Sequence, residues 1–305
     1  MQTRTRRSLL TTVAAGCGAG VAGCLGGTDA VSVLAAGSLA VVFEDHVGPA
    51  FEAETGTAVR GEYHGSTAVM RMITDDQKHP DVAVSADHRL LRDRLYERHT
   101  DWDVAFASNA VGLAYGRDTW VADRLAAGDP WYEVVRDAPA GDLAISDPAL
   151  DPLGYRAVLA FRLAEREHGL DDFAAPTLER AYREPEEPQL LAGVETGNRA
   201  AAVAYRNMAV AHDLSFEPFP PAYNFADPDR AETYASASYT TADGYAVTGA
   251  PIVYNATVLA DAAAPAAGRR FVQFLATATD VLRENGLAVA SFPRAHGAVP
   301  SGVLP

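Results

Sequence analysis

Two short segments of the sequence combine an apolar run of strand length, a Gly-Ser pair and the start of a predicted helix. The pairs are Gly37-Ser38 and Gly65-Ser66. The first turn of a helix has N–H groups without partners and a partial positive charge. Glycine lets the backbone approach a ligand closely, and serine adds a hydroxyl donor. Such a turn can hold a small anion without any cationic side chain.

A structural role is the alternative for both serines, because serine very commonly caps a helix. For one such turn alone, capping is the more common role. Here the turns occur in two successive strand–helix units, and ligands of open parallel sheets bind at the carboxyl ends of strands. We therefore favour an anion site that includes Ser38 and Ser66.

Catalytic chemistry finds little support in the sequence. A serine nucleophile needs a base within reach, yet there is no G-x-S-x-G motif, and His46 and His64 show no telling spacing relative to Ser38. The histidines are scattered and form no H-E-x-x-H motif, which disfavours a zinc site. The sequence favours a binding protein over an enzyme, and we expect no cofactor.

The charge of the chain is strongly acidic. Among its 305 residues, 40 are Asp or Glu and 25 are Lys or Arg, which gives a formal net charge of −15. Lys78 is the only lysine. A diffuse acidic surface repels nucleic acid and anionic lipid, and it resembles proteins from very salty surroundings, where ions screen self-repulsion. An anion must therefore be held by local donors, because the net charge does not attract it.

The first residues resemble an export signal. Arg6 and Arg7 precede a short apolar run that is briefer than the ~20 residues of a membrane span. This pattern predicts a cleavable signal peptide of the twin-arginine type over residues 1–23. The run ends in a segment resembling a lipobox, so we expect Cys24 to carry lipid and residues 24–30 to form an anchored linker. No cysteine follows Cys24, so the mature part has neither a disulfide nor a thiol nucleophile.

The remaining residues, about 280, suffice for two ordinary domains. Strands and helices alternate at first, which argues for a parallel sheet with right-handed crossovers. We expect strands at 31–36, 59–63, 81–85, 110–115, 143–146, 200–205, 216–219 and 252–254. We expect helices at 39–54, 68–74, 87–97, 131–135, 155–168, 189–194 and 266–285, and an irregular segment at 220–240.

Several short motifs follow one another along the chain in a fixed order. They are AGSL at 36–39, GS at 65–66, DPLGYR at 151–156, AYR at 204–206 and VTGAPIVY at 247–254. This ordered set resembles the archaeal-type tungstate/molybdate-binding proteins of ABC importers, and the resemblance covers nearly all of the chain after the leader. The DPLGYR and VTGAPIVY strings are its most specific parts.

The resemblance implies an α/β protein of the type II periplasmic-binding-protein fold, with two lobes that are each a mostly parallel sheet flanked by helices. We expect residues 31–108 plus 249–305 in one lobe and 109–248 in the other. The implied function is to capture molybdate or tungstate and to deliver it, without chemical turnover, to an ABC permease. We expect a monomer, held by a lipid anchor at the outer face of the cell membrane.

The resemblance also implies a ligand set. Ser38 and Ser66 match the serines whose hydroxyls and neighbouring amides hold the oxyanion, Asp151 matches an aspartate ligand, and Tyr205 matches a residue of the second lobe that contacts the ligand. A glutamate completes the set, and spacing places it at Glu187.

Two nearby glutamates, Glu184 and Glu186, are alternatives to Glu187. Without the resemblance, Asp151 would be read as a turn residue before proline and Glu187 as one exposed charge in a Glu/Pro-rich stretch. Arg156 either faces the cleft or pairs with an acid on the surface.

Carboxylates beside a dianion should repel it. Two arrangements avoid this repulsion: a carboxyl is protonated and donates a hydrogen bond, or its oxygen binds the central atom directly. Molybdenum and tungsten accept more than four oxygen ligands, whereas sulfur and phosphorus do not do so stably. The resemblance implies a roughly six-coordinate centre with Asp151 and Glu187 bound directly to the metal. Such a site rejects sulfate, because sulfate leaves both carboxylates uncompensated.

Two alternative functions remain. The first is binding of sulfate, phosphate or ferric ion. A ferric site, however, typically uses paired tyrosines and a histidine in the cleft, and no motif in the sequence indicates such a set. The second is an exported hydrolase that uses Ser38 or Asp151.

Overall fold

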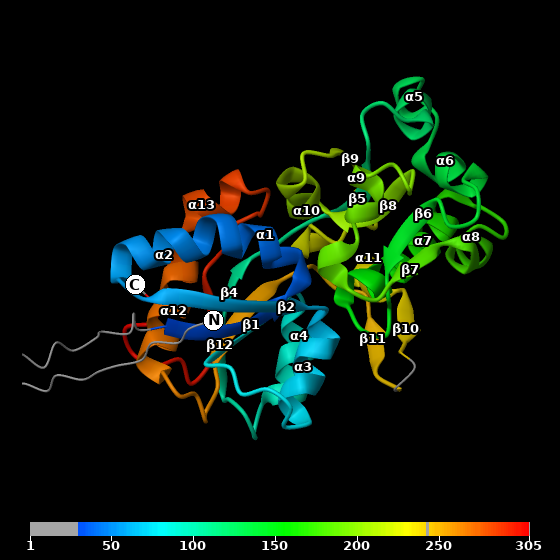
Figure 1. The fold of residues 1–305 in the computed structure, drawn as a ribbon. Helices are drawn as coiled ribbons and strands as arrows, with labels where there is room; N and C mark the ends of the chain where they lie inside the picture. Colours follow the sequence, from blue (N-terminus) through cyan, green and yellow to red (C-terminus); the bar gives the residue numbers. More distant parts are fainter. Residues whose placement is uncertain (1–29, 242–243, 305) are drawn as a thin grey trace, which may run out of the picture.

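The computed structural model describes residues 30–241 and 244–304. The predicted signal peptide and Cys24 lie outside the described residues. Within the two described ranges, no helix combines the length and the apolar character needed to cross a bilayer. The chain forms two α/β parts, each built around its own sheet (Figure 1). We call the first sheet with its helices the first lobe, and the second sheet with its helices the second lobe.

The first sheet has the strand order β13-β4-β12-β3-β1-β2. β1 pairs in parallel with β2 and β3, whereas β12 is antiparallel to both β3 and β4, and β13 is antiparallel to β4. The strands are β1 (Ala30–Ala36), β2 (Ala58–His64), β3 (Val82–Ser85), β4 (Trp102–Ala107), β12 (Tyr254–Val258) and β13 (Arg294–Gly297).

The second sheet has the order β7-β6-β8-β5-β9. β6 is parallel to β7 and β8, whereas β5 is antiparallel to both β8 and β9. The strands are β5 (Val111–Tyr115), β6 (Leu143–Ser146), β7 (Tyr182–Glu184), β8 (Ala201–Tyr205) and β9 (Ser215–Pro218).

One antiparallel strand sits inside each sheet, β12 in the first and β5 in the second. Each is the first strand of its sheet after the chain has come from the other lobe. The chain leaves the first sheet between Ala107 and Val111 and returns between Thr248 and Tyr254. The remaining strands of both sheets run mostly in one direction, and the predicted α/β class with two flanked sheets is confirmed.

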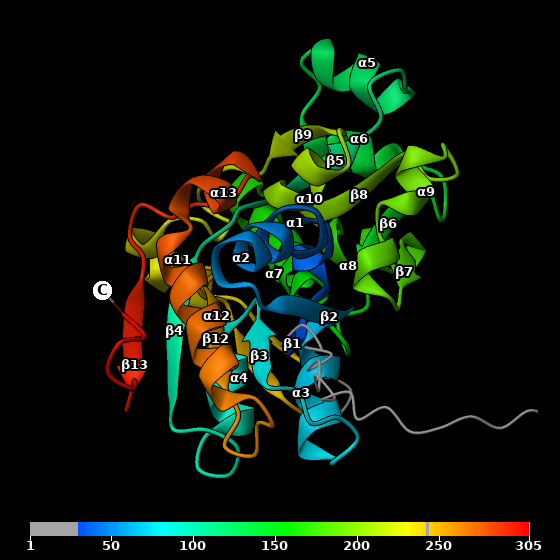
Figure 2. The ribbon, with the colours of Figure 1, turned by 60° about the vertical axis from the view of Figure 1, so that its left-hand side comes forward.

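Helices cover both faces of the first sheet, which explains why β1 is a continuous apolar run. Val33 belongs to the same buried apolar cluster as Phe51 of α2 and Phe271 of α12, whose rings are in contact, and α12 lies across the strands in Figure 2. Leu34 packs with Leu91 on the face of α3 and α4. The helices are η1 (Gly37–Leu39), α1 (Ala40–Val42), η2 (Phe43–Val47), α2 (Gly48–Thr55), α3 (Ser66–Thr74), α4 (His88–Leu95), α12 (Pro265–Thr277) and α13 (Thr279–Glu284).

The second sheet packs against α7, whose apolar face joins an aromatic cluster around Trp131. Phe161 of α7 lies 5.5 Å from the Trp131 ring, and Phe219 lies 4.2 Å from it, as ring centroids. The helices are α5 (Trp120–Ala126), α6 (Trp131–Asp137), α7 (Pro152–His168), α8 (Ala174–Arg180), η3 (Glu187–Gln189), α9 (Ala192–Glu195) and α10 (Arg206–Ala211).

The segment predicted as irregular, 220–240, contains η4 (Pro228–Arg230), α11 (Ala231–Ala235) and β10 (Ser238–Thr240). β10 pairs in antiparallel fashion with β11 (Ala246–Thr248), which follows that segment. The strand predicted at 252–254 begins only at Tyr254, because the Ile252 N–H bonds instead to the Phe225 carbonyl. The predicted C-terminal helix is interrupted at Ala278. The first predicted helix contains a π-helical stretch, η2, just ahead of Pro49, a residue that removes one helical hydrogen bond.

Candidate functional site

The two Gly-Ser turns lie side by side. β1 and β2 are parallel neighbours, and their last residues, Ala36 and His64, are paired in register. Ser38 follows in η1 with 5% of its surface exposed, and Ser66 opens α3 with none. Neither serine caps its helix through its side chain. Both hydroxyls are thus buried at the carboxyl edge of the first sheet.

Asp151 approaches this edge from the second lobe. It is the N-cap of α7, where its Oδ1 accepts a hydrogen bond from the Leu153 N–H at 3.1 Å. Only 1% of Asp151 is exposed, and its Oδ2 has no hydrogen-bond partner among the described residues. The Leu150 carbonyl accepts a bond from the Ala68 N–H at 3.1 Å, which joins the start of α7 to α3.

Gly65 is what permits this approach. A Cβ atom at Gly65 would meet the Leu150 carbonyl and would lie 2.8 Å from the Asp151 Cβ. Glycine is used here for close backbone approach, as its position in the turn predicts.

Glu187 lies against the Gly37-Ser38 turn, much as Asp151 lies against the Gly65-Ser66 turn. It is fully buried in η3, and neither carboxylate oxygen has a hydrogen-bond partner in the described part of the chain. A Cβ atom at Gly37 would lie 2.8 Å from its Oε2. Glu186, in contrast, has 58% of its side chain exposed and lies 3.5 Å from His64. Glu184 accepts a bond from the Glu186 N–H near the surface.

The electrostatics of the two carboxyl groups are unusual. Burial raises the pKa of Asp151 above its ordinary value. Burial also raises the pKa of Glu187, and the nearby Asp151 charge raises it further. The Gly37 and Ser38 amides and the Ser38 hydroxyl lie near enough to offset part of this increase, although none makes a hydrogen bond of ordinary geometry to Glu187. Two desolvated carboxylates that lack a full set of donors are costly to keep ionised without an additional positive centre.

Tyr205 lies at the end of β8 and is fully buried. Its hydroxyl accepts a hydrogen bond from Arg156 Nη1 at 2.6 Å, and its ring stands 6.1 Å from that of Tyr254. The Tyr254 hydroxyl lies 3.1 Å from Ser38 Oγ. The structure therefore brings all five predicted residues, Ser38 and Ser66 with Asp151, Glu187 and Tyr205, to the contact between the two lobes.

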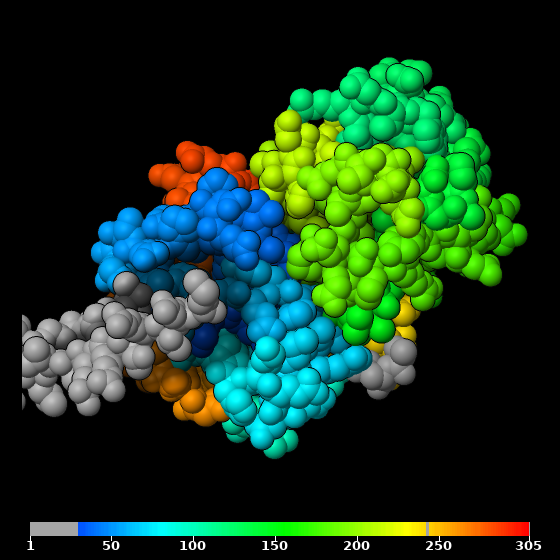
Figure 3. All heavy atoms as spheres, viewed as in Figure 1, coloured from blue at the N-terminus to red at the C-terminus, as the bar shows by residue number. Residues whose placement is uncertain are grey.

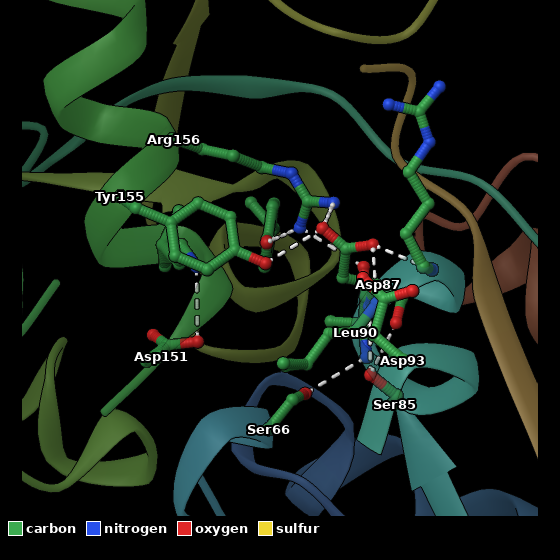
Figure 4. Close-up of polar contacts among 12 residues, drawn as sticks. Ser66, Ser85, Asp87, Leu90, Asp93, Asp151, Tyr155 and Arg156 are labelled. Atoms are coloured by element: carbon green, nitrogen blue, oxygen red, sulfur yellow. Dashed lines mark hydrogen bonds and ion pairs between the residues drawn. The ribbon is translucent and has the colours of Figure 1, made fainter. Parts of the chain in front are cut away.

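Arg156 is buried rather than on the surface. It donates to the Ala86 carbonyl at 3.0 Å and pairs with Asp87 Oδ2 at 3.2 Å (Figure 4). Tyr155 also donates to Asp87 Oδ2, at 2.7 Å. Both residues belong to the second lobe and Asp87 to the first. The two lobes meet directly in the space-filling view of Figure 3.

Two asparagines that we did not single out also tie the lobes together. Asn207 of α10 donates to the Ser38 carbonyl at 2.6 Å, and Asn109 donates to Asn207 Oδ1 at 2.7 Å and to the Tyr254 hydroxyl at 3.2 Å. The position of Asn207 directly after the AYR string was the available signal, and Tyr254 ends the VTGAPIVY string.

The combination of two lobes with buried polar groups between them is typical of proteins that enclose a solute. Residues 31–288 match the family described as bacterial extracellular solute-binding protein. The chain belongs to this family. Extracellular solute-binding proteins act outside the cytoplasm, so the predicted extracytoplasmic class is confirmed.

Two relatives of this solute-binding protein match along nearly their whole length. A solute-binding protein of Halobacterium salinarum is 53% identical over 301 residues, which cover 98% of this chain and 97% of the relative. The molybdate/tungstate-binding protein WtpA of Pyrococcus abyssi is 30% identical, with 93% of each chain covered. The predicted resemblance to archaeal tungstate/molybdate-binding proteins is confirmed.

A solved structure with the same fold is the periplasmic molybdate-binding protein of Azotobacter vinelandii. The TM-score is 0.64 at 17% identity, with 86% of this chain and 100% of that chain covered. At this identity the likeness establishes the fold, which is that of a two-lobed solute-binding protein.

Proposed function

We propose that this solute-binding protein captures molybdate or tungstate outside the cell membrane and delivers it to an ABC permease, without chemical turnover. One observation carries the proposal: Asp151 Oδ2 and both Glu187 oxygens are buried beside two serine turns and make no hydrogen bond within the described residues. The printed names of the Pyrococcus relative and the Azotobacter structure agree with this ligand class.

The carboxylates argue for an oxyanion whose central atom can expand its coordination. Asp151 and Glu187 would each give an oxygen to the molybdenum or tungsten centre, which supplies the positive charge that the buried pair lacks. The hydroxyls of Ser38 and Ser66 would donate to the oxo groups, with help from amides of the two turns. Tyr205 would contact the ligand from the second lobe.

Sulfate and phosphate suit this site poorly, because their central atoms cannot accept the carboxylates. They would bind either against two like charges in a desolvated space or with the carboxyl groups protonated as hydrogen-bond donors, which would make their binding fall as the pH rises. Ferric ion is the other binding alternative, and Tyr205 and Tyr254 do lie together. The Tyr205 hydroxyl, however, accepts a hydrogen bond from the Arg156 guanidinium, whose positive charge opposes a bound cation there. The Tyr254 hydroxyl is engaged by Ser38 and Asn109. Among the described residues, no three His, Cys, Asp or Glu side chains gather where they could hold a metal ion.

The hydrolase alternative lacks a histidine base beside its candidate nucleophiles. The hydrogen bond of the Ser38 hydroxyl runs to Tyr254, and the described residues offer no histidine bonded to Ser38 or Asp151. We therefore propose binding alone.

We further propose that residues 31–108 plus 249–305 form one lobe and 109–248 the other, and that they close by a hinge motion. Every strand of the second sheet comes from residues 111–218, in support of that division. A twin-arginine signal over 1–23, a lipid on Cys24 and a monomeric state complete the proposal. The variant Cys24→Ala, expressed in the native host, tests the anchor. We expect the wild type in the membrane fraction and the variant released from it.

Calorimetry on the leaderless protein in high salt tests the function. We expect tight binding of molybdate and tungstate, with weak or no heat for sulfate. Equal heats for sulfate and molybdate would contradict direct coordination by the carboxylates. Binding of ferric citrate in place of the oxyanions would support the ferric alternative.

A further inference from the structure

A buried polar network crosses from one lobe to the other beside the proposed ligand site. Asp87 follows β3 in the first lobe and caps α4, with its Oδ1 accepting from the Arg89 N–H at 2.9 Å. Its other oxygen, Oδ2, accepts from Tyr155 at 2.7 Å and from Arg156 at 3.2 Å, and both donors lie on α7 of the second lobe (Figure 4).

All three side chains are removed from solvent. Asp87 is 7% exposed, Tyr155 1% and Arg156 2%. Burial alone would raise the pKa of Asp87, but Arg156 and the Tyr155 hydroxyl hold that pKa below its ordinary value. The pair is therefore ionised, and salt in the solvent screens it far less than a surface pair. Separating the lobes would part Asp87 Oδ2 from Tyr155 and Arg156, its two donors in the second lobe.

The network is joined to the ligand set on both sides. The Ala86 peptide donates its N–H to Ser66 Oγ at 3.0 Å, and its carbonyl accepts from Arg156 at 3.0 Å. Arg156 also donates to the Tyr205 hydroxyl, and it lies little more than one helical turn after the N-cap Asp151. Holding Arg156 against Asp87 thus sets where the start of α7 stands relative to the serine turns.

We propose that Asp87, Tyr155 and Arg156 form an interlobe lock that holds the protein closed around its ligand without touching the ligand. Asp87 is the positioning residue of this lock. The inference rests on the proposed function, because it assigns the lock to the slow release of a bound oxyanion. Breaking one partner of a buried, hydrogen-bonded charge pair acts mainly on the dissociation rate.

The chain contains a matched control for this lock. Asp103 is fully buried and accepts from Arg92 Nε at 2.8 Å and from the Tyr96 hydroxyl at 2.6 Å. This is the same trio of an aspartate, an arginine and a tyrosine, but all three residues belong to the first lobe. Removing its charge should lower stability without acting on lobe closure.

The experiment compares the leaderless wild type with the variants Asp87→Asn, Tyr155→Phe and Asp103→Asn. Asparagine keeps the cap of α4 and removes the charge. Stopped-flow displacement of molybdate gives the dissociation rate, and thermal melting of the ligand-free protein reports stability. We expect Asp87→Asn to raise the dissociation rate by about tenfold or more, and Tyr155→Phe by a smaller factor. Asp103→Asn should lower the melting temperature and leave the dissociation rate within about twofold.

Unchanged dissociation in both Asp87→Asn and Tyr155→Phe would overturn the lock, as would an equal acceleration in Asp103→Asn, which would indicate general loosening. If Asp87→Asn does not fold, Tyr155→Phe alone decides, because it removes only one hydroxyl. A wild type that binds neither molybdate nor tungstate would defeat the proposed function itself, and the lock with it. Normal wild-type binding with no variant effect would defeat the lock alone.

A second readout follows closure directly. The sequence has no cysteine after position 24, so one dye can be attached to an introduced cysteine on each lobe. With molybdate bound, we expect Asp87→Asn to spend more time in the low-transfer, open state than the wild type or Asp103→Asn. Identical transfer distributions in all three proteins would overturn the lock.

Discussion

At the scale of single residues, the site is defined by oxygen atoms that lack donors. We expect Asp151→Asn and Glu187→Gln each to weaken molybdate binding by about 10- to 100-fold or more, since each removes a negative oxygen that the metal centre would accept. Calorimetry measures the change. Glu184→Gln and Glu186→Gln are the controls, because neither side chain is buried against the serine turns. Loss of affinity only in a control would move the second carboxylate to that position.

The raised pKa values predict how stability depends on pH. Burial raises the pKa of Asp151 and Glu187, so the folded, ligand-free protein binds more protons than the unfolded chain above about pH 4. Their contribution to the free energy of unfolding is therefore present at low pH and is lost as the pH rises through the folded pKa values. Urea titrations between about pH 5 and pH 8 should show this decline, and the double variant Asp151→Asn with Glu187→Gln should flatten it. An equal slope in the double variant would contradict this assignment.

How far these residues could be predicted differs from one to the next. Ser38 and Ser66 could be proposed from local chemistry, because a strand, a Gly-Ser pair and a helix are all adjacent in sequence. Burial of Glu187 could not, because its Glu/Pro-rich surroundings indicate an exposed connection. Glu187 is buried against parts of the first lobe that are remote in sequence, among them Gly37.

At the scale of elements, the start of α7 carries Asp151 into contact with α3. Gly65→Ala should weaken molybdate binding by about tenfold, because a new Cβ would press on the Leu150 backbone and oppose closure. Gly193→Ala is the control, since its Cβ would meet only the flexible Arg199 side chain, at 2.8 Å from Cγ. Calorimetry of both variants measures the change. Equal molybdate affinities of Gly65→Ala and Gly193→Ala would show that the contact at Gly65 can accommodate a Cβ atom.

Some elements could be read from the sequence and others could not. The apolar runs predicted β1, β3 and β5 closely, because strands buried on both faces need no alternation. β4 was missed, since Asp103 interrupts its apolar run and is compensated only by Arg92 and Tyr96 in the fold. α7 was predicted to begin at Tyr155 but begins at Pro152, although an aspartate before a proline is a common helix start.

At the scale of the whole molecule, the net charge of −15 predicts a dependence on salt. Added ions shorten the range of repulsion between acidic surface groups. We expect the melting temperature to rise by a few degrees between about 0.1 M and 2 M sodium chloride, equivalent to about 1 kcal/mol. Sucrose at matched water activity is the control for solvent exclusion. A melting temperature that responds equally to both solutes would count against screening.

The position of β12 has a consequence for synthesis of the chain. The five strands of the second sheet lie within residues 111–218, so that sheet can form while the ribosome is still adding later residues. The first sheet cannot, because β12, which lies between β3 and β4, is made only near the end. Until then one edge of β3 and both edges of β4 lack their partner strands, because β13 is made later still, and unpaired edges can aggregate.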